Sequence, residues 1–424
     1  MQKIGNLTII ALVILNIVVW LVFPPVNDGD PNFLRKYAGE VIGSNNIVLM
    51  ACSLFLATRP KWAEKYFGGL DKMYITHRHT GTAALLLIFV HVLTVPISTT
   101  GWRLGNYLAV ISFAGIVSIV LITLAPRIPF LNRLAGADYE DWKKLKRWIG
   151  IFFILAFFHS LTVDALDARI AITWTMMFFI IGTVSYLYTE VFSGIFKKSL
   201  PYKVEAVRHP NNSSTEVTLR PRKEPIRKQR AGQFLFVRFP SDKALNESHP
   251  FTISSAPAED VLRLTIKASG NFTRDLFAKL QEGGEAIIQG AYGMFDYKTG
   301  GTKQIWIAGG IGVTPFLSFI RDMNDSLAHD VDFYYTVRHP EEALFLDEIK
   351  AADEKNSRLR THVRFSATEG SLTIDHIVKN TNGDIKNYHV YLCGPLPMIQ
   401  AFEQKFLALG LPKQQIHFEE FNFR

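Results

Sequence analysis

Cysteine is almost absent from this sequence, because only Cys52 and Cys393 occur in 424 residues. Two cysteines so far apart exclude a disulfide framework and a cysteine-built metal site, so any metal must use other ligands. The chain has no internal repeat or low-complexity tract, and its 12% aromatic content excludes a disordered protein. Its length allows two or three domains.

Long apolar runs are confined to the first 197 residues. Each run is close to the roughly 17 to 25 residues that a helix needs to cross a bilayer core of about 30 Å. Buried helices of a soluble domain are the alternative, but six such runs would leave that domain almost without polar surface. We therefore expect a bundle of six transmembrane helices at residues 7–23, 41–57, 80–95, 107–125, 148–163 and 170–196.

Basic residues are unevenly divided among the connections between these runs. The second and fourth connections hold eleven Lys and Arg residues, whereas the other three hold four. By the positive-inside rule the basic connections face the cytoplasm, which also places the N-terminus and everything after Lys197 there. The formal net charge of +8 is therefore a topology signal and predicts no nucleic-acid partner.

Histidines lie within the apolar runs, where an ionisable side chain is unfavourable and usually marks a functional site. His77 and His91 are 14 residues apart, about 40° short of four full helical turns, so they face the same way at two depths, and His79 does not share this face. His159, in the fifth run, lies at a depth similar to that of His91. Two imidazoles facing each other, with no thiolate nearby, are typical of bis-histidine haem ligation. Hydrogen-bonded core histidines are the alternative.

The chain after Lys197 alternates short apolar runs with turn residues. This pattern predicts strands at residues 233–238 and 262–268 and a helix at 273–280. From Gln304 the order becomes strand, glycine-rich turn, helix and strand, which is typical of a parallel sheet wound in crossover units. We expect three domains: a transmembrane domain at 1–197, a domain rich in short strands at 198–302 and an α/β domain at 303–424.

The apolar part of the chain resembles the ferric reductase and NADPH oxidase family. Helices 3 and 5 of that family each carry two histidines that hold two stacked b-type haems, and His77 to His91 matches the helix 3 pattern. The resemblance implies an outer haem between His91 and His159. The inner pair would be His77 with Lys146, and a protonated lysine cannot ligate iron. One haem b is therefore expected, and two haems are the alternative.

The cytoplasmic part resembles the ferredoxin-NADP reductase superfamily, with His-Pro-Phe-Thr-Ile-Ser-Ser at 249–255 matching its flavin-contacting motif. Residues 270–273 are similar to the element near the FAD pyrophosphate, although Thr273 could instead be a simple helix cap. Residues 290–293 are similar to a glycine turn of the family, with Ala291 in place of proline. The resemblance implies that FAD is bound by His249, Pro250, Phe251, Thr252, Ser255, Gly270, Phe272, Thr273, Gly290, Tyr292 and Gly293.

The segment 305–315 runs from a strand through glycines into a helix whose free amides can hold a pyrophosphate. It resembles the superfamily's nicotinamide-dinucleotide loop, and residues 393–395 resemble its Cys-Gly-Pro element beside the nicotinamide. We assign Cys393 to packing and orientation, because hydride transfer belongs to the cofactors. The implied nucleotide contacts are Gly309, Gly310, Gly312, Thr314, Pro315, Cys393, Gly394 and Pro395.

Two further residues are predicted to affect how the nicotinamide nucleotide binds. Arg338, at the end of a predicted strand, could meet a 2′-phosphate and favours NADPH over NADH, although Glu341 and Glu342 follow it. The C-terminal segment resembles the family's closing strand, whose aromatic residue shields the flavin. Phe421 is the predicted shield and catalytic residue, and Phe423 is the alternative.

We therefore expect a six-helix transmembrane bundle, an antiparallel β-barrel flavin domain and an α/β nucleotide-binding domain. The resemblance implies that electrons pass from cytoplasmic NAD(P)H through FAD and haem to an outer acceptor, either oxygen, giving superoxide, or a ferric or cupric chelate. One alternative is an electron-delivery module for a quinone or an extracytoplasmic redox protein. Another is a flavin reductase that the membrane part only anchors.

Overall fold

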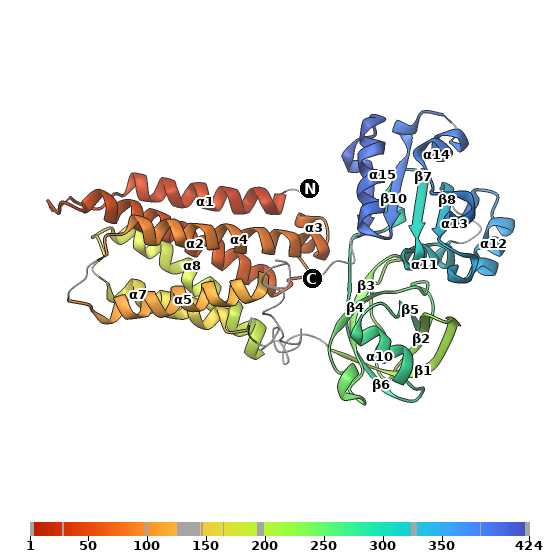
Figure 1. The fold of residues 1–424 in the computed structure, drawn as a ribbon, viewed down its shortest axis with the longest axis horizontal. Coiled ribbons are helices and arrows are strands. Elements are labelled where there is room, and N and C mark those ends of the chain that lie inside the picture. Colours follow the sequence, from red (N-terminus) through yellow and green to blue (C-terminus); the bar gives the residue numbers. More distant parts are fainter. Residues whose placement is uncertain are drawn as a thin grey trace. The chain divides into compact units, whose positions relative to one another are not determined.

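The computed structural model describes residues 4–27, 29–97, 101–124, 145, 147–163, 165–192, 199–323, 329–381 and 383–419. The chain divides into two compact units, Met1–Phe196 and Lys197–Arg424 (Figure 1). The first unit is helical, and the second contains two sheets.

Helices of the first unit overlap the six predicted apolar runs, and their count as six membrane spans stays a prediction. Four of them, in the described residues, are long and apolar enough to cross a bilayer: α1, α2, α5 and α8 with its π-helical extension η2. The fifth, α7, has only 14 residues, and α4 carries Asp71, Lys72 and Arg78 in its first turns. The helices are α1 (Ile4–Val22), α2 (Phe33–Ala57), α4 (Leu70–Thr94), α5 (Leu104–Leu124), α7 (Ile149–Thr162), α8 (Arg169–Leu187) and η2 (Tyr188–Phe192).

Helix α8 shows how this unit separates its inner from its outer surface. Its buried residues recur every three or four positions, as one face of a helix does: they are Ala171, Thr175, Phe178, Phe179, Gly182 and Ser185. A Cβ on Gly182 would lie 2.6 Å from the Phe153 ring, so this glycine permits the close approach of α7. The opposite face exposes large apolar residues such as Ile180 and Val184, at 58% and 60%. An exposed apolar face of this kind is typical of a helix that contacts lipid.

The first sheet of the second unit is antiparallel and has the strand order β4-β3-β6-β1-β2-β5. Its edge strands β4 and β5 meet at an isolated bridge between Ile253 and Leu264, and closure into a barrel stays a prediction. The predicted strands and helix at this part of the chain are present as β3, β5 and α10. The elements are β1 (Leu200–Asn211), β2 (Ser214–Pro221), β3 (Phe234–Arg238), β4 (His249–Thr252), β5 (Leu262–Lys267), α10 (Asn271–Lys279) and β6 (Glu285–Tyr292).

The second sheet is parallel and has the order β11-β10-β7-β8-β9, which confirms the predicted crossover pattern. Helices α11 and α12 pack on one face, and α14 and α15 on the other. The elements are β7 (Lys303–Gly309), α11 (Thr314–Asp322), β8 (Asp330–Val337), α12 (Leu346–Lys355), β9 (Leu359–Phe365), α14 (Ile374–Asn380), β10 (His389–Cys393), α15 (Leu396–Ala408) and β11 (Ile416–Glu419).

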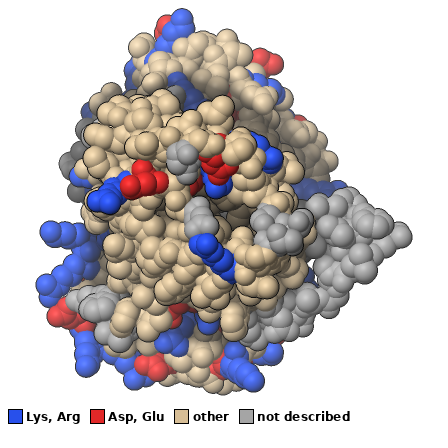
Figure 2. Space-filling view, turned by 90° about the vertical axis from the view of Figure 1, so that its left-hand side faces the viewer, with Lys and Arg blue, Asp and Glu red and all other residues tan. Residues whose placement is uncertain are grey.

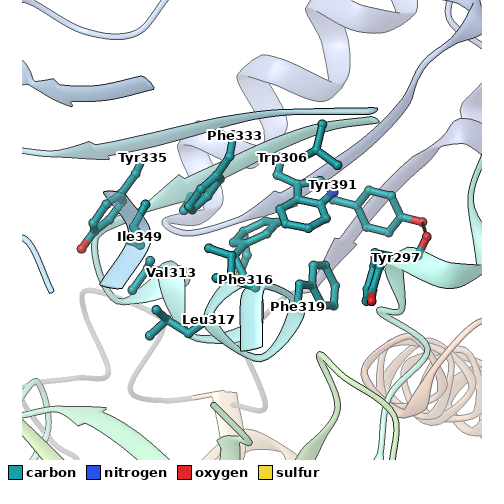
Figure 3. Close-up of a cluster of buried hydrophobic side chains, with 14 of the residues drawn as sticks. Tyr297, Trp306, Val313, Phe316, Leu317, Phe319, Phe333, Tyr335, Ile349 and Tyr391 are labelled. Carbon is teal, nitrogen blue, oxygen red and sulfur yellow. Dashed lines mark hydrogen bonds between the residues drawn. The ribbon is translucent and has the colours of Figure 1, made fainter. Parts of the chain in front are cut away.

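Strand β7 supplies both faces of this sheet, because successive side chains of a strand point to opposite sides. Ile305 and Ile307 belong to one hydrophobic cluster, and Trp306 belongs to the other. In the second cluster the Trp306 ring packs edge-on against Phe319 of α11, with centroids 5.1 Å apart (Figure 3). This packing fixes α11, and therefore the glycine-rich turn that precedes it, against the end of β7.

Candidate functional site

His91 and His159 lie at the same end of the helical unit. Each is three residues before the last residue of its helix, α4 or α7, and its carbonyl accepts the final-turn hydrogen bond, from Val95 or Val163 respectively. The two residues thus occupy equivalent positions in their helices, and their matched depth in a membrane stays a prediction.

Each of these imidazoles is oriented by a backbone carbonyl on a neighbouring helix. The Nδ1 atom of His91 is 2.8 Å from the Gly39 oxygen on α2, and Nδ1 of His159 is 2.9 Å from the Gly105 oxygen on α5. A carbonyl only accepts, so Nδ1 carries the proton and the lone pair is on Nε2. No hydrogen bond to either Nε2 occurs among the described residues. A core histidine would normally use both nitrogens, whereas a haem ligand needs Nε2 free.

Glycines allow the two rings to lie close to the neighbouring helices. A Cβ on Gly43 of α2 would be 3.0 Å from Cε1 and Nδ1 of His91. A Cβ on Gly105 would be 2.8 Å from the backbone of Thr162, one turn from His159. A larger residue at either position would displace an imidazole or separate two helices. The donor set and its surroundings thus fit an iron held between two neutral imidazoles.

His77 lies on α4, 14 residues before His91, and its imidazole also contacts a backbone carbonyl through Nδ1. Its Nδ1 is 2.8 Å from the backbone oxygen of Ser53 on α2. Lys146, the residue that stands in the expected place of its partner, lies outside the described residues. His79 is exposed, in agreement with its different helical face.

Strand β4 holds the predicted flavin motif against the start of α10. The His249 ring stacks on Phe272 at 3.8 Å between centroids, and Phe251 lies 6.3 Å from the same ring. The Thr252 hydroxyl is buried and has no hydrogen-bond partner among the described residues. An unpaired buried hydroxyl is unfavourable in isolation, so it fits a site in which a ligand supplies the missing partner.

Replacing Thr252 with valine should have opposite effects on the free and the FAD-bound protein. Removal of an unpaired hydroxyl should leave the thermal stability of the apoprotein unchanged or raised, because no bond is lost. The dissociation constant of FAD should rise about fivefold, the value of one hydrogen bond of about 1 kcal/mol. Flavin fluorescence titration measures it, and Thr252→Ser is the matched control. A lower apoprotein stability with unchanged FAD affinity would contradict this assignment.

The remaining flavin candidates have mixed roles. The Thr273 hydroxyl accepts hydrogen bonds from the Gly270 amide at 2.9 Å and the Ser269 amide at 3.0 Å. Thr273 therefore caps the start of α10, which is the alternative that the sequence left open. The Ser255 hydroxyl is buried and accepts the Arg263 amide at 3.1 Å. Gly290 and Gly293 adopt positive φ angles of 149° and 105°, which glycine tolerates best.

The predicted nucleotide loop and the Cys-Gly-Pro element lie in contact, although about 80 residues separate them in sequence. A Cβ on Gly312 would be 2.3 Å from the Cys393 carbonyl oxygen and 2.7 Å from the Gly394 nitrogen. A Cβ on Gly309 would be 2.9 Å from the Pro395 ring. The glycines therefore allow two backbone segments to pack directly at the carboxyl ends of β7 and β10, where open α/β sheets bind ligands.

Cys393 is fully buried in β10. Burial, and then the neighbouring Glu419 carboxylate, raise the pKa of the Cys393 thiol well above its usual range. The thiol is therefore protonated at neutral pH and a poor nucleophile, which supports a packing role. Glu419 itself is only 3% exposed and pairs with Cys393 across the sheet, a placement that the sequence did not indicate. Phe421 and Phe423 lie outside the described residues.

A second contact missed by the sequence joins α11 to the flavin motif. The Arg321 guanidinium donates to the Ser254 carbonyl at 2.7 Å and to both carboxylate oxygens of Glu348. The Ser318 hydroxyl donates to the Ser255 carbonyl at 2.7 Å. Helix α11 is thus fixed at one end to the nucleotide loop and along its length to the segment after Thr252. No motif predicts the bonds of Ser318 and Arg321 to the flavin motif, because they join residues more than 60 positions apart.

The end of β8 has one exposed cation, Arg338, followed by two acids. The Glu342 carboxylate lies 3.9 Å from Lys267, and the Glu341 carbonyl accepts from Asn211. The Glu342 carboxylate is thus close to a cation of the antiparallel sheet, and the exposed Arg338 stays the predicted contact for a 2′-phosphate.

Three family models match successive parts of the chain. The ferric reductase-like transmembrane component matches residues 42–110, an FAD-binding domain matches 199–309 and an oxidoreductase NAD-binding domain matches 306–404. The chain has the domain architecture of the ferric reductase and NADPH oxidase family. It is a membrane-linked oxidoreductase that transfers electrons with FAD-binding and NAD-binding domains.

Individual relatives cover between about half and nine tenths of this chain. The propane 2-monooxygenase reductase component of Mycolicibacterium smegmatis is 28% identical over 55% of this chain and 70% of its own length. Flavohemoprotein A of Dictyostelium discoideum is 24% identical over 47% of this chain and 54% of its own length. A flavohemoglobin structure from Malassezia yamatoensis has a TM-score of 0.51 and 17% identity over 91% of this chain and 97% of its own, a likeness of fold alone.

Proposed function

We propose that this protein takes electrons from NADPH in the cytoplasm and delivers them to an acceptor outside the membrane. When bound, FAD would convert a hydride into single electrons and haem b would carry those electrons through the bilayer. The observation that supports this proposal most directly is the pair His91 and His159. In each, Nδ1 is hydrogen-bonded to a glycine carbonyl, and Nε2 has no partner among the described residues. A membrane anchor for a flavin enzyme would need no such pair.

The chain's own residues supply the geometry for these groups. His249, Phe251 and Phe272 offer stacked rings for a planar cofactor, and the Thr252 hydroxyl offers a bond to its polar edge. Gly309 and Gly312 let the nucleotide loop pack against the Cys-Gly-Pro element, and the loop leads into the start of α11, whose free amides would hold the pyrophosphate. The hydrogen bonds of Ser318 and Arg321 to the segment after Thr252 fix α11 relative to the flavin motif. The remaining residues that resemble the superfamily's flavin and nucleotide contacts belong to the same proposal.

We propose that each chain binds one haem, held by His91 and His159. His77 is oriented as a ligand, but the residue that would face it is a lysine, and a charged ammonium has no lone pair for iron. Two haems would require Lys146 to lose its proton or another residue to take its place.

Charges at the two ends of the helical unit support six spans with the N-terminus in the cytoplasm. At the end near His91 and His159, basic residues are neutralised by acids: Lys36 by Asp30 at 2.5 Å and Arg169 by Asp167 at 3.5 Å. Figure 2 shows this end, with acidic and basic side chains beside one another on a largely uncharged surface.

The opposite end has basic residues on aromatic rings. Arg59 lies over Tyr74 and Lys65 over Tyr66, at 5.4 and 4.8 Å. Cations with interfacial aromatics are typical of a cytoplasmic boundary.

Sealed vesicles test the proposal and identify the acceptor. NADPH is supplied on the side that bears the second unit, and membrane-impermeant probes for superoxide and for ferric chelate reduction are enclosed on the other side. We expect one of the two signals to require NADPH. Reduction confined to the NADPH side would contradict the proposal and favour an anchored flavin reductase. Reduction of a membrane quinone alone would favour an electron-delivery module.

The choice of NADPH depends on Arg338. Replacing Arg338 with alanine should lower kcat/KM for NADPH by about 10- to 100-fold, because a charge-assisted bond to a phosphate contributes about 1.5 to 3 kcal/mol. The kcat/KM for NADH should stay within about twofold of the original protein. Steady-state assays with both nucleotides measure the ratio, and an equal loss for both would show that Arg338 does not distinguish them.

A further inference from the structure

The connection between β2 and β3 is strongly basic. Residues 220–230 contain six Lys and Arg residues and a single acid, Glu224. Arg222, Lys223, Arg227 and Lys228 are exposed. Arg227 is 3.5 Å from Glu224, and within the described part of the chain no carboxylate pairs with Arg222, Lys223 or Lys228. We call these four residues the basic loop.

The basic loop is an ordered feature of the flavin domain. The Arg222 amide donates to the Pro201 carbonyl at 3.1 Å, and the Ile226 amide donates to the Tyr202 hydroxyl at 2.9 Å. Ile226 is 8% exposed and Tyr202 is 1% exposed, so the middle of the loop is anchored in the core while the cations point outward. Lys228 has a φ of 60°, a conformation in which glycine or asparagine would be less strained.

Both anchors belong to the point where the chain enters the second unit. Pro201 follows Phe192, the last described residue of the helical unit, by nine positions. An extended chain covers at most about 3.5 Å per residue, or about 30 Å over this length. The covalent connection therefore limits the distance between Pro201, one of the loop's anchors, and Phe192 to about 30 Å.

We propose that the basic loop binds anionic lipid headgroups of the membrane leaflet that faces the second unit, and so holds the flavin domain against the bilayer. This inference rests on the proposed function for its assignment of that leaflet to the cytoplasm. The leaflet attracts juxtamembrane cations, and each Lys or Arg close to the surface strengthens binding about fivefold. Arginine and lysine side chains pair well with phosphate, and the exposed chains of the loop are free to reach it.

The test uses the full-length protein in lipid nanodiscs made of phosphatidylcholine, with or without about one third phosphatidylglycerol. Hydrogen exchange of the backbone amides in residues 222–228 is the readout. We expect slower exchange in the anionic discs, and we expect high salt to remove the difference because it screens the attraction. Lys223→Glu with Lys228→Glu should weaken docking at least about 25-fold, two factors of five, and also remove the difference.

The matched control is Lys350→Glu with Lys379→Glu, which reverses two exposed charges on α12 and α14. It should keep the lipid-dependent protection. Equal exchange in neutral and anionic discs would overturn the proposal, and so would protection that survives the loop substitutions. A nanodisc exposes both leaflets and the readout needs no electron transfer, so this result is independent of the vesicle assay that tests the function.

Discussion

Replacing His159 with alanine is expected to abolish haem binding and electron transfer through the membrane. Alanine removes one of two axial ligands, and a haem held by His91 alone would lose its low-spin character and most of its affinity. The original protein should contain about one haem per chain in a pyridine haemochrome assay, and the variant close to none. The low-spin Soret band should disappear with it.

Two controls separate loss of the ligand from loss of the fold. His79→Ala removes an exposed histidine from the same helix as His91 and should keep the haem. The His159 variant should also keep its FAD and its NADPH-dependent reduction of ferricyanide, which can take electrons from the flavin. A full Soret band in the His159 variant would refute the ligand assignment, and two haems per chain in the original protein would refute the single-haem proposal.

Gly312→Val is expected to eliminate NADPH-dependent turnover and leave the rest of the protein intact. Its Cβ would lie 2.3 Å from the Cys393 carbonyl oxygen, so the loop and the Cys-Gly-Pro element would have to separate. A misplacement of about 1 Å at a reacting centre can lower the rate about 100-fold, and we expect at least that loss in flavin reduction by NADPH. Stopped-flow absorbance of the flavin measures this rate, and dithionite should still reduce the flavin.

Gly310→Asn is the informative comparison, because the two glycines are required for different reasons. A Cβ on Gly310 meets nothing within 4 Å, but its φ is 56°. Asparagine tolerates this conformation, so the Gly310→Asn protein should keep much of its stability.

The Gly312→Val prediction has a clear contrary outcome. Flavin reduction by NADPH within about twofold of the normal rate in this variant would contradict direct backbone packing at this site.

Much of the fold follows from local sequence. The six apolar runs, the parallel sheet after Gln304 and the glycine-rich turn before α11 are consequences of hydrophobic periodicity and glycine placement. The length of each membrane helix is less predictable. The structure begins α4 at Leu70, ten residues before the apolar run, because its polar first turns remain helical.

The candidate site is only partly legible in the sequence. Motifs identify His91, His159, the strand around Thr252 and the loop around Gly312, because each depends on residue type at a short spacing. They do not identify Gly39 and Gly105 as acceptors, since only their backbone oxygens take part and any residue has one. The motifs also do not identify Arg321 and Glu419, because the partners of these residues are distant in sequence and are brought near by tertiary packing.

The most direct test of the central claim follows the redox state of the haem during turnover in sealed vesicles. NADPH is added outside to anaerobic vesicles whose second unit faces outward, and half of the samples enclose an impermeant ferric chelate. We predict that NADPH reduces the haem in vesicles without the chelate. The reduced haem should then be reoxidised by one of the two acceptors, either the enclosed chelate or oxygen when air is admitted. A haem that NADPH does not reduce, or that neither acceptor reoxidises, would contradict the account.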